Sequence, residues 1–186
     1  MKGAAIYLLI FCQVGLAMAD HIEERTAASR AVAGEFMSAL KAELMKAMRE
    51  GGPSNAIKVC KDVAPEIAAQ KSKATGWGVA RTSLKVRNPA NAPDTWEKEV
   101  LESFEVRRAK GESVNTLEHG EIVIKNGKRV FRYMKAIQTR GICLRCHGTN
   151  IDPAVAEALK QFYPQDQATG FKLGDIRGAF TITQPM

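Results

Sequence analysis

The chain has 186 residues, of which 45% are hydrophobic and 25% are charged, and its formal net charge is +7. This composition is typical of one folded domain, and it excludes a chain that is disordered throughout, a collagen and a membrane protein with many spans. Four cysteines are too few for a chain of this length to be a disulfide-stabilised scaffold. No basic run has aromatic residues interleaved with it, which argues against nucleic acid as a partner.

The first nineteen residues have the organisation of a secretory signal peptide. Lys2 supplies a positive start, residues 4–16 are almost entirely apolar, and Ala17-Met18-Ala19 is a small-residue cleavage signal. We expect cleavage after Ala19, a periplasmic location and no membrane span afterwards; an uncleaved anchor is the alternative. The mature chain, residues 20–186, keeps three of the four cysteines, so any pairing leaves one thiol over in an oxidising compartment.

The elements predicted first are helices. Between residues 22 and 49 apolar side chains recur every four positions, which predicts one long amphipathic helix that ends at Gly51-Gly52-Pro53. A second helical stretch over residues 54–74 carries Pro65 in its interior, so we expect a kink or a break there. Residues 20–74 are therefore the helical N-terminal part of a single domain.

The remaining pattern predicts a strand, a capped helix, a hairpin, a short helix and a last strand. The segments are residues 79–86, 94–111, 121–125 with 128–137, 152–162 and 174–183. Asp94 and Glu97 have capping-box spacing, and Asn126-Gly127 is a strong signal for a two-residue hairpin turn. The order predicts an α+β fold in which helices pack around a small antiparallel sheet.

One motif carries specific chemistry. Cys143-Leu144-Arg145-Cys146-His147 is C-x-x-C-H, the attachment signature of c-type haem. On a helical turn both thiols face one side and can add to the vinyl groups of one porphyrin, while His147 reaches the iron from that side. A disulfide, a zinc site and a thioredoxin-type pair are the alternatives, but zinc would need further ligands and the redox pair a βαβ unit. The motif predicts one covalent haem c, with Cys143 and Cys146 as thioethers and His147 as the proximal ligand.

Several side chains of the mature chain could supply the other axial ligand. They are His21, His119, Met37, Met45, Met48, Met134, Met186 and Cys60. Cys60 lies on the apolar face of its predicted helix, it is the thiol left over, and Lys58 and Lys61 beside it could help to hold a thiolate. An inert buried cysteine is the alternative, so the residues alone leave ligation by Cys60 open.

Several segments of the chain resemble a known family. They are AIKVC and APEIA at 56–60 and 64–68, RTSLKVRNPANAPDTWE at 81–97, and CLRCH at 143–147. These segments are similar to the PAS-like monohaem c domain, which is described from a cyanobacterial cytochrome with His/Cys axial ligation and occurs as the extracytoplasmic module of receptor kinases. The resemblance implies a PAS-like antiparallel sheet with an N-terminal helical extension. It also implies Cys60 as the distal iron ligand and residues 81–97 as part of the pocket wall.

The combined expectation is a periplasmic, low-potential monohaem c-type cytochrome, because a thiolate ligand favours ferric iron. Electron transfer to a redox partner protein and redox or gas sensing of NO or CO both fit. A small haem reductase or peroxidase is the alternative, and turnover at the iron would require Cys60 to leave first. Arg81, Arg87 and Arg145 are candidate propionate contacts, since guanidinium pairs well with carboxylate. The long N-terminal helix could join copies of the chain into an oligomer.

Overall fold

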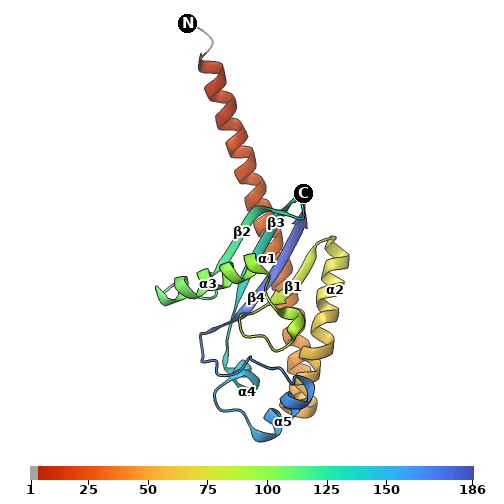
Figure 1. The fold of residues 1–186 in the computed structure, drawn as a ribbon. Helices are drawn as coiled ribbons and strands as arrows, with labels where there is room; N and C mark the ends of the chain where they lie inside the picture. Colours follow the sequence, from red (N-terminus) through yellow and green to blue (C-terminus); the bar gives the residue numbers. More distant parts are fainter. Residues whose placement is uncertain (1–3) are drawn as a thin grey trace.

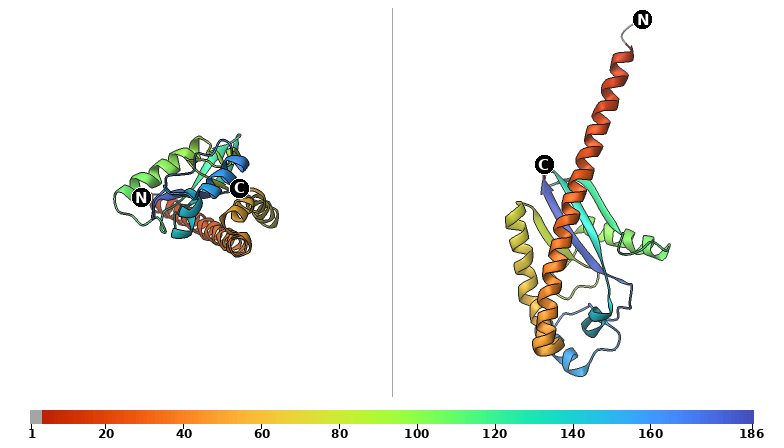
Figure 2. Two further views of the ribbon diagram at one scale, coloured as in Figure 1. Left: turned by 90° about the horizontal axis from the view of Figure 1, so that it is seen from below. Right: turned by 180° about the vertical axis from the view of Figure 1, so that it is seen from behind.

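The computed structural model describes the backbone of residues 4–186 and the side chains of residues 21–186. Its centre is a four-stranded antiparallel sheet with the strand order β1-β4-β3-β2 (Figure 1). The strands are β1 (Gly78–Thr82), β2 (Glu118–Lys125), β3 (Lys128–Gln138) and β4 (Ile176–Pro185). Helices cover both faces of this sheet (Figure 2). The structure therefore confirms the predicted α+β class with an antiparallel sheet and a helical N-terminal extension.

The first helix, α1 (Ala4–Lys58), crosses one face of the sheet and is interrupted at Gly51 and Gly52. Gly52 has a φ of 67°, a conformation that favours glycine, so the predicted helix end at this position is confirmed. The signal peptide predicted over residues 1–19 lies outside the part of the chain with described side chains, and its cleavage stays a prediction. Within the described part, none of the helices combines the length and the apolar character needed to cross a membrane.

A π-helical turn follows α1 and contains Cys60. The turn spans Val59–Val63 and leads directly into α2 (Ala64–Thr75). Pro65 lies in the first turn of α2, where its missing N–H is not needed for the helix. The break predicted at Pro65 thus takes the form of a π-turn just before it. Such turns are rare and occur frequently at functional sites.

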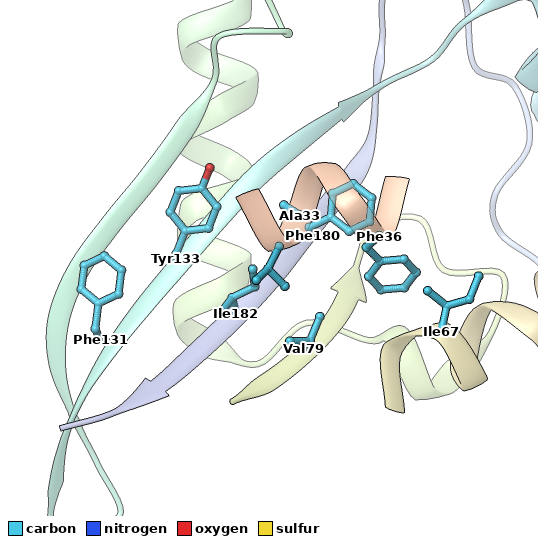
Figure 3. Packing of buried hydrophobic residues seen from close by; sticks show 9 residues of the cluster. Ala33, Phe36, Ile67, Val79, Phe131, Tyr133, Phe180 and Ile182 are labelled. Atoms are coloured by element: carbon cyan, nitrogen blue, oxygen red, sulfur yellow. The ribbon is translucent and has the colours of Figure 1, made fainter. Parts of the chain in front are cut away.

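The two sides of the sheet carry separate apolar clusters because strand side chains alternate between faces. On one face, Phe36 of α1 packs against Ile67 of α2 and Phe180 of β4, and the rings of Phe36 and Phe180 lie 5.0 Å apart (Figure 3). On the other face, α3 (Thr95–Ala109) packs against β3 and β4. That second cluster contains Val100, Leu101, Phe104, Met134, Ala136, Ile176 and Ala179. Each fully buried large side chain contributes about 1.5–3 kcal/mol.

Local signals set the ends of several elements as predicted. Asp94 and Glu97 form the capping box at the start of α3, with backbone-to-carboxylate distances of 2.9 and 3.1 Å. Asn126 and Gly127, both with positive φ, connect β2 to β3. The short helix α5 (Pro153–Phe162) is capped by Asp152, whose carboxylate accepts a hydrogen bond from the backbone N–H of Ala154. In contrast, β1 ends at Thr82 instead of continuing to residue 86.

Gly178 allows the end of β1 to approach β4 closely. Its φ is 155°, and a Cβ there would collide with the carbonyl oxygen of Thr82 and lie 3.0 Å from the Cβ of Ser83. The close approach brings the Ser83 hydroxyl within 2.8 Å of the carbonyl oxygen of Arg177, to which it donates a hydrogen bond. The chain therefore leaves the sheet at Ser83, which explains the short strand.

We expect Gly178→Ala to lower the free energy of unfolding by about 2–4 kcal/mol, because it combines a backbone clash with a strained φ. Urea unfolding followed by circular dichroism measures this change. Gly34→Ala is the matched control, since Gly34 lies on an exposed part of α1 with no atom near its added Cβ. Equal stability of the two variants would show that β1 and β4 do not need glycine at their contact.

Candidate haem site

The C-x-x-C-H motif lies on a short helical segment at the end of the sheet remote from the start of α1 (Figure 1). A 3₁₀ turn, Gly141–Cys143, runs directly into α4 (Leu144–His147). Helical spacing places Cys143 and Cys146 on the same side of this segment. Both thiols are free and partly buried. The motif thus has the local conformation that its spacing predicts.

The imidazole of His147 is oriented through its Nδ1 atom. Nδ1 donates a hydrogen bond of 2.7 Å to the carbonyl oxygen of Ala168, which leaves the lone pair on Nε2. Burial, and then the positive charges of Arg177 and Arg87, hold the pKa of His147 well below its ordinary value. The ring is therefore neutral at physiological pH. A neutral imidazole with Nδ1–H bound to a carbonyl presents Nε2 as a metal ligand.

A loop over residues 163–175 is joined to the motif by backbone hydrogen bonds. The amides of Phe171 and Gly170 donate to the carbonyl oxygens of His147 and Gly148, both at 2.9 Å. The ring of Phe171 meets the imidazole edge-on, with the ring centres 6.2 Å apart. Because this loop also contains Ala168, it fixes both the position and the rotation of His147.

Arg87 and Asp166 connect this loop to the motif. Arg87 is only 6% exposed. Its Nε donates to Asp166 at 3.0 Å, and its Nη2 donates to the carbonyl oxygens of Cys146 at 2.5 Å and Ala168 at 3.2 Å. The other carboxylate oxygen of Asp166 accepts from the amide of Ala168 at 2.7 Å. The pair therefore positions the carbonyl group that orients His147, a role that the sequence did not indicate for Arg87.

Arg177 at the start of β4 is a site residue that sequence reasoning missed. Its Nε lies 3.4 Å from Nε2 of His147, and its Nη1 donates to the Ser83 hydroxyl at 3.1 Å. Burial, followed by the positive charges of Arg87 and Arg81, lowers the pKa of Arg177 to about 10, so it remains a cation at neutral pH. Thirty residues separate it from His147, and no periodic pattern or motif connects the two positions.

Cys60 lies at the same end of the molecule as the motif. A negative charge on its sulfur would act on Arg81 and Arg177 and would oppose the lowering of their pKa values by burial. Burial raises the pKa of the Cys146 thiol, the positive charge of Arg87 opposes this rise, and a negative charge on Cys60 would add to it. The π-turn thus brings the third thiol within electrostatic range of both the motif and the arginines.

The wall beside Cys146 is apolar. It is formed by one residue of α1 and by the inner face and end of α5, and its buried members are Ile57, Val155, Leu159 and Tyr163. This surrounding lowers the local dielectric and excludes water, which suits a porphyrin ring and affects the properties of a bound metal.

Other residues predicted from the sequence lie elsewhere or at the surface. Arg145 is exposed. Among the alternative axial ligands, His119 contacts Glu121 at 2.9 Å, Met134 is buried under α3, and Met37 and Met186 are exposed. The segment 81–97 is divided: its first part reaches His147 through Arg87, whereas Glu97 pairs with Arg132 beneath α3 at 3.0 Å. Only the first part therefore borders the motif.

The donor set fits a haem group. Two thiols on one helical turn, a neutral imidazole whose Nε2 carries the lone pair, a third thiol nearby and an apolar wall are the groups that a covalently attached, axially ligated haem requires. Guanidinium groups also outnumber carboxylates around His147, which suits a cofactor that carries acidic side chains.

The comparisons with known proteins also point to haem binding. The family model Tll0287-like matches residues 15–185. A solved structure, the crystal structure of the cyanobacterial haem protein Tll0287, matches with a TM-score of 0.61 and 25% sequence identity, over 82% of this chain and 91% of that chain. No curated protein matches. These matches confirm the resemblance drawn from the sequence segments.

Proposed function

The chain belongs to the Tll0287-like family, and on that premise we propose that it is a periplasmic, low-potential monohaem c-type cytochrome. Cys143 and Cys146 hold the haem through thioether bonds, His147 is the proximal iron ligand and Cys60 is the distal ligand. The observation that carries the proposal is the hydrogen bond from Nδ1 of His147 to Ala168, which leaves the lone pair on Nε2, on the same helical segment as the two thiols.

The residues of the chain define what such a site can do. Haem iron, when bound, exchanges one electron between its ferric and ferrous states. A thiolate from Cys60 stabilises the ferric state and lowers the reduction potential, while the apolar wall around Cys146 limits solvent access. Protein ligands on both sides of the iron favour electron transfer or sensing over turnover of a substrate.

One observation favours redox or gas sensing as the role. Cys60 lies in a π-turn, so its thiol could withdraw through a local change of helical register while α1 and α2 stay folded. The rate of CO binding to the ferrous protein distinguishes a sensor, an electron carrier and a haem enzyme. Slow binding that levels off at high CO concentration supports a displaceable Cys60 and sensing of a small ligand. An absence of binding supports an electron carrier, and fast binding supports the small haem enzyme.

We expect the pigment to remain with the protein after acid–acetone extraction, because thioether bonds survive denaturation. The full chain, produced in a host with cytochrome c maturation, should show the added mass of one haem. A Cys143→Ala, Cys146→Ala double variant should lose this covalent pigment. Cys60→Ala is the matched control, since it also removes a partly buried thiol but should keep the pigment attached. Complete extraction of the pigment from the unmodified chain would contradict the central assignment.

A further inference from the structure

We propose that Arg177, together with Arg81, is a carboxylate-binding pair that receives the propionate groups of the haem. The inference rests on the proposed function and adds to it a residue that neither the motif nor the sequence pattern assigns. It also distinguishes the arginines from one another, because Arg87 forms an ion pair with a carboxylate of the protein and Arg177 does not.

Three guanidinium groups gather beside His147. Arg87 and Arg177 approach Nε2 of His147 at 3.5 and 3.4 Å, and the positive charge of Arg81 acts on His147 as well. Arg87 is paired with Asp166, at 2.9 Å between the charged atoms. In the part of the chain with described side chains, neither Arg81 nor Arg177 forms an ion pair with a carboxylate.

The partners that Arg177 does have are neutral. Its guanidinium donates to the Ser83 hydroxyl at 3.1 Å and to the carbonyl oxygen of Lys85 at 3.4 Å, and it lies over the ring of Phe171 at 5.3 Å. Arg81 lies over the ring of Phe36 at 5.7 Å. Neutral partners satisfy donors but leave the charge of a partly buried cation uncompensated, which is unfavourable.

A thiolate at Cys60 compensates only part of this charge. It carries one negative charge for two cations, and much of that charge is shared with iron once the sulfur is a ligand. The propionates of one haem supply two carboxylates, which match the two unpaired guanidinium groups in number and in chemistry. Guanidinium binds carboxylate through two parallel hydrogen bonds, a geometry that lysine cannot reproduce. Arg177 lies on the Nε2 side of His147, which is the side on which the haem would bind.

The test compares Arg177→Gln with Arg145→Gln in the full chain carrying covalent haem. Both variants lose one positive charge near the motif, but Arg145 is exposed. At a fixed ambient potential, Arg177→Gln should lower the ratio of ferrous to ferric haem by about tenfold, since removal of a nearby cation favours the ferric state. This corresponds to a potential about 59 mV lower for one electron. Arg145→Gln should change the ratio by less than about threefold, because solvent screens exposed charges.

Resonance Raman spectra identify the anion. Arg177→Gln should shift the propionate bending band. Arg177→Lys should shift this band too, because lysine lacks the forked geometry of guanidinium. Since lysine keeps the positive charge, Arg177→Lys should change the ratio of ferrous to ferric haem by less than about threefold. If Arg177→Gln does not fold, Arg177→Lys carries this test alone. Unchanged propionate bands with a shifted sulfur-to-iron charge-transfer band would overturn the assignment and make the Cys60 thiolate the partner. An unmodified chain without covalent haem would instead refute the proposed function.

Discussion

Replacing His147 with alanine is expected to abolish the low-spin spectrum of the ferric protein. The Nε2 atom of His147 carries the imidazole lone pair, because Nδ1 donates its hydrogen to the carbonyl oxygen of Ala168 at 2.7 Å. Alanine removes this donor and leaves the proximal side of the iron without a strong ligand. Absorption and electron paramagnetic resonance spectra should show a high-spin ferric haem that remains covalently attached, together with a reduced yield of mature protein.

His119→Ala is the matched control for this variant. His119 is partly exposed on β2 and contacts Glu121, so its loss should leave the haem spectrum unchanged. Added imidazole should restore a low-spin spectrum to His147→Ala, since it can occupy the space of the missing ring. A His147→Ala protein with the spectrum of the unmodified chain would show that another group is the proximal ligand.

The sequence predicted those parts of the fold that short-range signals determine. The capping box of Asp94 and Glu97 and the hairpin turn at Asn126 and Gly127 each depend on residues within four positions of one another. The glycines at 51 and 52 end the long helical run in the same local way. These local signals were sufficient to predict the order of the helices and strands and the α+β fold class.

The C-x-x-C-H motif was predictable for the same reason. Its conformation is set by a single helical turn, which the structure has. Cys60 was a candidate through its unpaired thiol, but the π-turn that carries it was not predicted.

The contacts that orient the motif could not be predicted from the sequence. Arg87 and Asp166 are separated by 79 positions, and Arg177 and His147 by 30. Charged residues are common at the surface, so nothing in the pattern distinguished these from Arg145, which the structure leaves exposed. Only the folded chain shows which cations are turned inward.

The second large effect is expected at Cys60. Cys60→Ser replaces a soft anionic donor with a weak neutral hydroxyl, so the ferric protein should change toward high spin. The reduction potential should rise by more than about 0.1 V, because axial ligands tune haem potentials over about 0.8 V. Binding of CO to the ferrous protein should become faster, since no strong ligand has to leave first. Spectroelectrochemistry and stopped-flow absorption measure the two effects.

Cys60→Met separates loss of the thiolate from loss of any ligand at this position. Thioether sulfur can ligate haem iron and raises the potential, so this variant should stay low-spin while its potential rises. Cys60 is partly buried. A change in its packing alone would lower the stability of both variants but would not give them different spin states. If both variants keep the spectrum, potential and CO binding of the unmodified chain, Cys60 is a packing residue. The distal ligand would then be a histidine or a methionine, or the site would be open, and the sensing role would lose its displaceable ligand.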